Sequence, residues 1–375
     1  MKKYGIIFLF TLFLVASCTF YVNENTDEDT LVNLNNLPYN LIININLNEV
    51  SSPEHASVYA AGYHKFCKDR VIDSLIRGDI VEIEQMAVGP WIKAEGTETT
   101  EYITIYNEII KGGLLYTLYK NDRSLTGDIE AIFPNETGRD SLTQQLQGYS
   151  MRENYQRNID LYFMRQYEAV EKVMSALYNT GFPNIELEVS YSLDVTVLSS
   201  QYLQHMSNER LENVPLVTFT KEDEVYYFQF RQIVNGIPLS NVLWEEGTRT
   251  NQGAETIINV FLSESGIESI YSVGLVTLHS EGVENRLLSK EQVINLLIKE
   301  YTGLIIQSEN RVEEMELCYI VISSSEGLIL TPAWVLLIES DAIWDDPLTG
   351  VLTPVTEYRY LVFNAITGEI IRKAS

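Results

Sequence analysis

The sequence predicts an α+β fold of two domains, in each of which helices pack on antiparallel sheets. Three observations lead to this prediction. Hydrophobic residues make up 45% of the 375 residues and charged residues 21%, which is typical of a globular chain long enough for two domains. Apolar side chains alternate with a period of two in some segments and recur at spacings of three and four in others. These segments follow one another without the strict alternation of strand and helix that a parallel sheet requires.

The charge of the chain excludes one class of partner and favours another. The sequence contains 52 acidic and 26 basic side chains, which gives a formal net charge of −26. Binding to nucleic acid depends on clustered Lys and Arg, so we expect no nucleic-acid partner. An acidic surface instead speeds association with basic proteins or peptides, and salt weakens that attraction.

The N-terminus has the layout of a signal peptide. Two lysines precede the apolar run from Tyr4 to Val15, whose twelve residues are too few to cross a bilayer as a helix. The following Val15-Ala16-Ser17-Cys18 resembles a bacterial lipobox, in which the cysteine receives a diacylglycerol group and becomes the mature N-terminus. The resemblance implies that residues 1–17 are a lipoprotein signal peptide and that Cys18 is the lipidation site. We therefore expect a protein anchored in the cell membrane on its extracytoplasmic face.

The first predicted domain follows a short tether. Residues 18–38 are acidic and rich in Asn, which is typical of a solvated linker, and residues 39–149 form the N-terminal α+β domain. Within this domain Tyr102, Thr104 and Tyr106 alternate with Ile103 and Ile105, which indicates a strand. The other elements that the pattern predicts are a strand over 41–50, a helix over 63–77 and a strand after Gly112-Gly113.

The second predicted domain covers residues 150–375. Apolar side chains from Tyr155 to Leu177 recur at helical spacing, and Gly181 and Pro183 end the predicted helix. A capping box of Ser289 and Gln292 begins another helix, with Leu297 on its apolar face. The strands that the pattern predicts are 185–197, 225–233, 256–262, 315–322, 331–339 and 357–364.

Short motifs in the second domain resemble known families. The segment FQFRQIVNGIPLSN (Phe228 to Asn241) is similar to thermolysin-type protease propeptides and to strands of YycH/YycI-type extracytoplasmic regulators. The helix over 288–303 and the later NAITGE segment resemble a PepSY-type unit, and the resemblance covers about 225–375. Along most of its length the chain is similar to uncharacterised lipoproteins of Gram-positive-type bacteria. These resemblances imply a second domain of the PepSY/YycI type that binds or restrains other proteins.

One departure from the regulator family limits what the resemblance implies. YycH/YycI-type proteins are held by a transmembrane helix, whereas this sequence has a lipobox that ends at Cys18. Partnership with a sensor kinase inside the membrane is therefore not implied.

The sequence contains no catalytic motif that we can identify. It lacks GxSxG, HExxH, GxxxxGK[ST] and CxxC, and its four histidines are scattered. His64 precedes Cys67 by three residues, which leaves a Cys–His nucleophile as an alternative, but the local sequence matches no hydrolase signature. Cys67 and Cys318 form either a disulfide or two separate buried thiols, and their apolar neighbours favour separate thiols. We expect no catalytic residue and no cofactor.

Two further features concern ligands. Glu339, Asp341, Asp345 and Asp346 lie in one acidic segment, for which both a Ca²⁺ site and a solvated loop remain open. Because the spacing differs from that of an EF-hand, the solvated loop is favoured and no metal site is predicted. Pro238 cannot donate to a neighbouring strand and therefore suggests a sheet edge. The binding residues that we predict beside this edge are Asn235, Gly236, Pro238 and Trp244.

Together these observations predict a lipid-anchored protein of the cell envelope that acts as a non-enzymatic binding or regulatory module. The expected partners are the membrane, through the anchor at Cys18, and an envelope protein or peptide of basic character. Two alternatives remain open at this stage. One is an envelope hydrolase with unrecognised residues, and the other is a propeptide-like inhibitor or chaperone of a secreted protease.

Overall fold

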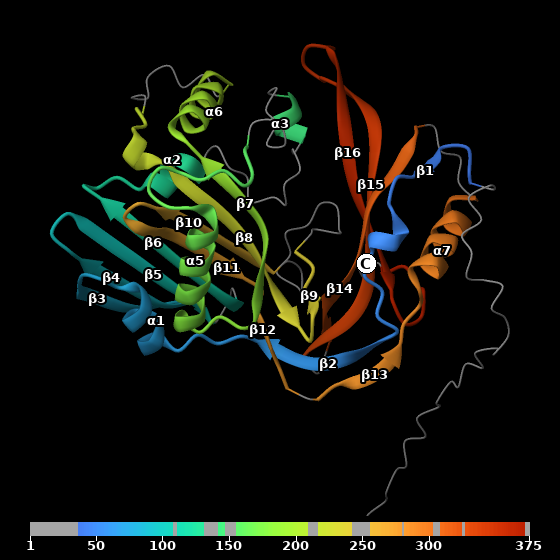
Figure 1. Cartoon of the computed structure of the whole chain (residues 1–375), viewed down its shortest axis with the longest axis horizontal. Helices are drawn as coiled ribbons and strands as arrows, with labels where there is room; N and C mark the ends of the chain where they lie inside the picture. Colours follow the sequence, from blue (N-terminus) through green and yellow to red (C-terminus); the bar gives the residue numbers. More distant parts are fainter. Residues whose placement is uncertain are drawn as a thin grey trace, which may run out of the picture.

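The computed structural model describes residues 37–107, 111–130, 142–146, 155–208, 217–241, 256–279, 281–302, 308–324 and 327–371. Within these residues most of the regular structure is strand, arranged in a seven-stranded and a nine-stranded sheet that lie side by side (Figure 1). The predicted α+β class, with two domains of helices packed on antiparallel sheets, is therefore wrong. The protein is mostly β, and its helices cover only parts of two large sheets.

The seven-stranded sheet follows the order β1-β14-β15-β2-β12, with β13 beside β2 and β16 beside β15. β1 runs parallel to β14, and all the other neighbours are antiparallel. Helix α7 (Lys290–Thr302) packs on one face of this sheet, and Leu297 is buried there as predicted. The strands are β1 (Leu41–Ile43), β2 (His55–Tyr63), β12 (Val276–Leu278), β13 (Val283–Arg286), β14 (Asn310–Ser324), β15 (Gly327–Asp345) and β16 (Leu352–Asn364).

The nine-stranded sheet follows the order β3-β4-β5-β6-β11-β10-β8-β7, with β9 beside β8, and all its neighbours are antiparallel. Its strands are β3 (Asp79–Met86), β4 (Gly89–Glu95), β5 (Thr99–Asn107), β6 (Lys111–Lys120), β7 (Ile185–Leu193), β8 (Val225–Val234), β9 (Ile237–Pro238), β10 (Ile257–Ser263) and β11 (Gly266–Val273).

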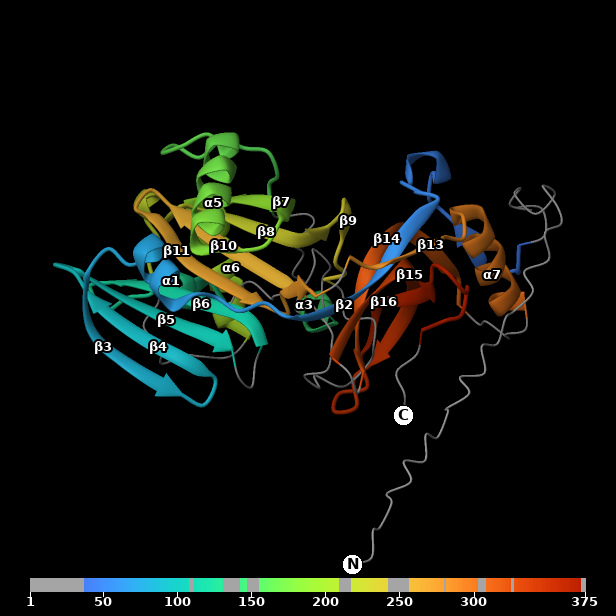
Figure 2. The same ribbon diagram turned by 90° about the horizontal axis from the view of Figure 1, so that it is seen from below.

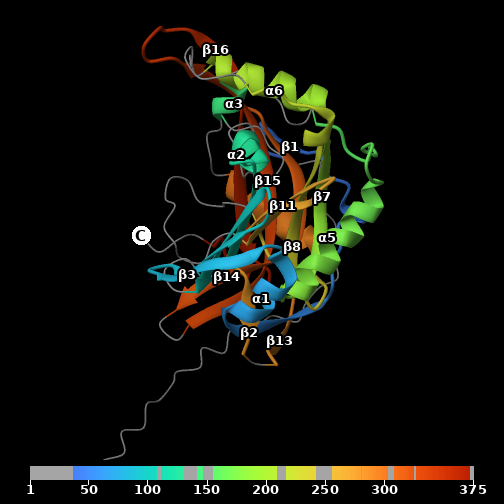
Figure 3. The ribbon, with the colours of Figure 1, turned by 90° about the vertical axis from the view of Figure 1, so that its left-hand side faces the viewer.

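Helices cover the two faces of the nine-stranded sheet unequally. Helices α1 (Lys68–Leu75) and α5 (Gln166–Thr180) lie side by side on one face, where Val71 and Val173 join the buried core (Figure 3). Helix α6 (Val195–Asn208) packs on the other face, near β7 and β8, through Leu198 and Tyr202. The remaining helical segments are α2 (Leu125–Glu130), α3 (Leu142–Leu146) and the 3₁₀ turns η2 (Leu47–Glu49) and η3 (Lys221–Asp223).

Both sheets pair strands that lie far apart in the sequence. β2 pairs with β15 in one sheet, and β6 pairs with β11 in the other. Each sheet therefore takes strands from both sides of residue 149. Neither of the predicted segments 39–149 and 150–375 contains a complete sheet.

Local signals in the sequence are confirmed where hydrogen bonds define them. The Ser289 hydroxyl accepts from the Gln292 amide at 3.3 Å, and the Gln292 side chain accepts from the Ser289 amide at 2.9 Å. Gly181 ends α5 with a φ of 103°, a left-handed conformation that glycine adopts without strain.

Other predicted elements differ in extent. The helix expected from Tyr155 begins only at Gln166, because residues 155–165 fold back on Tyr226. The strand expected over 185–197 ends at Leu193, because the Asp194 carboxylate accepts from the Val197 amide at 2.8 Å and starts α6.

Candidate binding surface

Strands β4, β5 and β6 bury one face and leave the other partly open to solvent. Successive side chains of a strand point to opposite faces, so the alternating isoleucines Ile92, Ile103 and Ile105 all enter the core. The opposite face carries side chains that are each partly exposed. We call this surface the polar–aromatic face, and it consists of Trp91, Lys93, Tyr102, Thr104, Thr117 and Tyr119.

Three aromatic rings form a connected row across the polar–aromatic face. The ring centroids of Trp91 and Tyr102 lie 5.8 Å apart with an angle of 33° between their planes. Tyr102 and Tyr119 lie 5.3 Å apart and meet edge to face at 82°. Each ring comes from a different one of three adjacent strands, so the row extends across the strands over about 10 Å.

Polar groups surround this row. Lys93 lies opposite Tyr102 in the β4–β5 register, and its Nζ is 2.6 Å from Glu95 Oε1. The hydrogen bond to Glu95 raises the pKa of Lys93, so its ammonium group stays charged. On β3, the edge strand next to β4, the exposed Glu82 and Glu84 lie opposite Lys93 and Trp91, respectively. The row of rings is thus bordered by both donors and acceptors.

The helices of the described chain leave this surface uncovered. Figure 2 shows α1 and α5 on the upper side of the nine-stranded sheet, with α5 above β8 and β10, and no described helix below β3, β4 and β5. A sheet face that the described helices leave open and that carries three neighbouring, partly exposed aromatic side chains is a candidate binding site.

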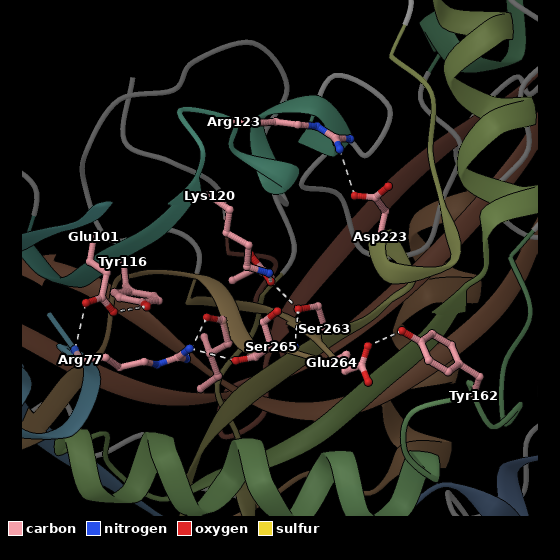
Figure 4. Close-up of polar contacts among 12 residues, drawn as sticks. Arg77, Glu101, Tyr116, Lys120, Arg123, Tyr162, Asp223, Ser263, Glu264 and Ser265 are labelled. Atoms are coloured by element: carbon pink, nitrogen blue, oxygen red, sulfur yellow. Dashed lines mark hydrogen bonds and ion pairs between the residues drawn. The ribbon is translucent and has the colours of Figure 1, made fainter. Parts of the chain in front are cut away.

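A second polar group of residues lies at the end of the same sheet, and its role is structural (Figure 4). Glu101 is buried, and its carboxylate accepts from the amides of Arg77 and Gly78, both at 2.9 Å, and from the Tyr116 hydroxyl at 2.8 Å. The buried Glu268 accepts from Lys120 Nζ at 2.6 Å and from the Ser263 hydroxyl.

The partners of these carboxylates tie neighbouring elements together. The Arg77 guanidinium donates to the carbonyls of Ser265 and Ile267 at the β10–β11 turn. The Tyr162 hydroxyl donates to Glu264 at 2.5 Å, which raises the pKa of Tyr162 to about 12. Because each buried carboxylate already holds two or more donors, this group fixes the strands and does not present a free acid–base pair.

The predicted binding residues lie in a connection between the two sheets. Asn235 and Gly236 form the tight turn between β8 and β9, with φ values of 49° and 81°. Asn235 Nδ2 donates to the Tyr59 hydroxyl at 2.5 Å. The Ser240 amide donates to the Tyr319 carbonyl at 2.8 Å, so the strand edge expected beside the half-buried Pro238 is occupied by β14.

Two predicted sites fall outside the described residues. These are the lipidation site Cys18 and the binding residue Trp244. Whether Asn235, Gly236 and Pro238 bind a partner stays a prediction.

Cys67 and Cys318 are both free thiols. Cys318 is buried, and its burial raises the pKa of the thiol well above the ordinary value. Cys67 is exposed at the start of α1, so the prediction that it is a buried thiol is wrong. The His64 ring packs against Phe66, and its Nδ1 lies 3.1 Å from the Thr277 hydroxyl.

The acidic segment Glu339–Asp346 is mostly strand and not loop. β15 continues through Asp345, and Arg311 holds Asp341 by two hydrogen bonds of 2.7 and 3.1 Å. Across the described residues, no group of three or more His, Cys, Asp or Glu side chains is placed to hold a metal ion. In the same part of the chain, no helix has the length and apolar character that a membrane span needs.

Sequence reasoning missed Trp91 and Lys93 as members of one surface. It identified the alternation in β5 but assigned no element to residues 79–95. The signal was present in the sequence, because Trp91 and Lys93 alternate with Ile92 and Ala94 in the same way.

Comparison with known proteins identifies a fold and no activity. No family model and no curated protein matches the chain. The chain is similar to the crystal structure of an uncharacterised protein from Eubacterium rectale, with a TM-score of 0.59 and 14% sequence identity. The match covers 90% of this chain and 92% of that one. At this level of identity the likeness concerns the fold alone.

Proposed function

We propose that the chain is a non-enzymatic, lipid-anchored binding protein of the cell envelope whose polar–aromatic face binds a neutral oligosaccharide. The observation that carries this proposal is the row of three partly exposed rings, Trp91, Tyr102 and Tyr119, on a sheet face that the described helices leave open. A lipid anchor at Cys18 places such a surface outside the membrane, where envelope glycans are present.

The chemistry of the face suits a sugar. The C–H faces of a pyranose ring are apolar and pack on aromatic rings, while its hydroxyl groups need donors and acceptors at the border. Lys93 and the tyrosine hydroxyls donate, and the neighbouring Glu82 and Glu84 carboxylates accept. A pocket for a compact ligand is not required, because a flat row binds an extended chain.

Charge decides the class of glycan. The net charge is −26, and the residues that border the row include Glu82, Glu84 and Glu95. A polyanionic polymer is repelled by this surface, whereas a neutral or amino-sugar oligosaccharide is not. The proposal therefore names neutral oligosaccharides.

The test measures binding of the full chain, purified in detergent, to neutral hexasaccharides of glucose, mannose and N-acetylglucosamine. We expect saturable binding to one of them by calorimetry and by tryptophan fluorescence. Trp91→Ala is expected to weaken binding at least tenfold, which corresponds to about 1.4 kcal/mol. Trp344→Ala is the matched control, because Trp344 is also an exposed tryptophan but lies in the other sheet.

Three results contradict the proposal. They are the absence of binding to any neutral glycan, binding that Trp91→Ala leaves unchanged, and cleavage of the bound glycan. The last result favours the hydrolase alternative.

A further inference from the structure

The second half of the β15–β16 hairpin projects from the seven-stranded sheet as an arm. The two strands pair without interruption from Ala333–Asn364 to Asp345–Leu352. Figure 1 shows their outer part extending beyond β14 and β2, with the connecting turn at its far end. We call residues 341–356 the arm.

The end of the arm displays large apolar side chains. Leu348 is 94% exposed and Ile343 is 68% exposed, while Val351 and Leu352 are each more than half exposed. Trp344 is exposed on the opposite face of the same hairpin. Single exposed apolar residues are common, but four more than half exposed within one hairpin end, Ile343, Leu348, Val351 and Leu352, are a concentration typical of an interaction site.

The turn that carries these side chains is held by its own hydrogen bonds. The Asp346 amide donates to the Val351 carbonyl at 3.0 Å, and the Gly350 amide donates to the Asp346 carbonyl at 2.7 Å. The Asp346 carboxylate accepts from the Leu348 amide at 2.8 Å and from the Thr349 hydroxyl at 2.5 Å. Leu348 is therefore presented in a fixed position, which reduces the entropy lost when a partner binds it.

The base of the arm is also fixed. Gln145, from α3, donates to the Thr356 carbonyl at 2.8 Å and accepts from the Thr356 amide at 2.7 Å. This side chain occupies the outer edge of β16 in the manner of a neighbouring strand. Pairing with another strand is therefore blocked at Thr356.

Charge identifies the partner. Residues 339–358 contain five acidic side chains and no Lys or Arg. Arg311 pairs with one of them, Asp341, whereas Asp345 and Asp346 lie next to the apolar cluster. A second copy of the chain brings the same acidic arm, and an anionic lipid surface is equally repelled.

We propose that the arm end docks into an apolar groove of a second protein whose rim carries Lys or Arg. Leu348 and Ile343 fill the groove, and Asp345 and Asp346 face the basic rim. This interaction is independent of the oligosaccharide site, which lies on the other sheet. It involves no covalent step.

The test places a photo-crosslinking amino acid at position 348 of the full chain in its native cells. The matched control places it at Val283, which is 69% exposed on β13, in a different part of the seven-stranded sheet. We expect a protein adduct from position 348 and none from position 283. In isolated envelopes, we expect Asp345→Lys to lower the yield of the position-348 adduct at least threefold. Raising the salt from about 0.05 to about 0.5 M is expected to have an effect of the same size.

The captured protein is then purified and its affinity for the full chain is measured. Leu348→Ser is expected to weaken binding at least tenfold, whereas Val283→Ser is expected to leave it unchanged. Trp91→Ala is also expected to leave it unchanged, which separates this proposal from the oligosaccharide site.

Four results overturn the proposal. An adduct with lipid identifies a membrane surface, and an adduct with a second copy identifies self-association. The absence of any adduct, or an adduct whose yield depends on neither salt nor Asp345, shows that the arm does not dock in the way described.

Discussion

Removing the Glu101 carboxylate tests whether the buried acids at the end of the nine-stranded sheet are structural. In Glu101→Ala the Tyr116 hydroxyl loses its buried acceptor, which costs about 1–3 kcal/mol. The amides of Arg77 and Gly78 are only partly buried, so water replaces much of what they lose, and each contributes about 0.5–1 kcal/mol. The expected loss in the free energy of unfolding is therefore about 2–5 kcal/mol.

Glu101→Gln is the matched variant, because its carbonyl oxygen still accepts from both amides. Its NH₂ group faces the Tyr116 hydroxyl, which rotates and accepts instead of donating. We expect this variant to lose less than about 2 kcal/mol. Urea unfolding measures both changes, and hydrogen exchange at the amides of Arg77 and Gly78 is expected to accelerate only in the alanine variant.

Two outcomes refute this reasoning. A loss below about 1 kcal/mol in Glu101→Ala means that the three donors do not depend on the carboxylate. A stable Glu101→Gln variant that abolishes turnover of a glycan means that Glu101 acts in catalysis.

Three further predictions concern the core, an ion pair and the anchor. Leu297→Ala is expected to lower the free energy of unfolding by about 2–5 kcal/mol, and the exposed Lys299→Ala by less than about 0.5 kcal/mol, both measured in urea. Arg311 lowers the pKa of Asp341, so the stabilisation from this exposed pair is present above about pH 4 and is lost as the pH falls through the lowered pKa. Asp341→Asn is therefore expected to cost at most about 1 kcal/mol at neutral pH and progressively less as the pH falls below about 4, and a difference that stays constant with pH contradicts this. Cys18→Ala is expected to release the chain from the membrane fraction or leave it unprocessed, and continued acylation of the variant contradicts the lipobox.

The parts of the fold that the sequence predicts are those with a local cause. The capping box at Ser289 needs only residues within one turn, and so does the glycine that ends α5. The alternation of Tyr102 with its isoleucine neighbours records burial of one strand face, which is also a local pattern.

The strands that were not predicted lack such a local sequence pattern. All eight residues of β3 are exposed, because it is an edge strand that the helices do not cover, so alternation of apolar and polar side chains has no buried face to report. β15 extends to Asp345 because β16 supplies its hydrogen bonds, and its acidic sequence conceals this pairing. Both candidate sites were missed for the same reason. The polar–aromatic face includes residues of β4, the arm includes the end of β15, and the sequence pattern predicted neither strand segment.

The spacing that predicted a helix from Tyr155 had a different cause. Leu161 and Met164 bond through their backbone to the buried Tyr226 hydroxyl, at 2.6 and 2.7 Å, and this contact replaces a helical turn. Tertiary structure overrides the helical pattern here, because a buried hydroxyl must find partners. The pairing of β2 with β15 is likewise set by contacts between residues far apart in the chain.

The joint between the sheets combines apolar packing with polar contacts, since Val234, Ile237 and Leu239 enter the core of the seven-stranded sheet. Arg231 on β8 donates to both carboxylate oxygens of Glu316 on β14, at 2.6 and 2.8 Å. Taking such a pair out of water offsets much of its attraction, so it adds little net stability but imposes a fixed geometry, because both hydrogen bonds form in only one arrangement. The Asn235–Tyr59 contact and the Ser240–Tyr319 backbone bond cross the same joint. The sequence motif that resembled a binding edge therefore fixes the register of the two sheets, and with it the position of the arm relative to the polar–aromatic face.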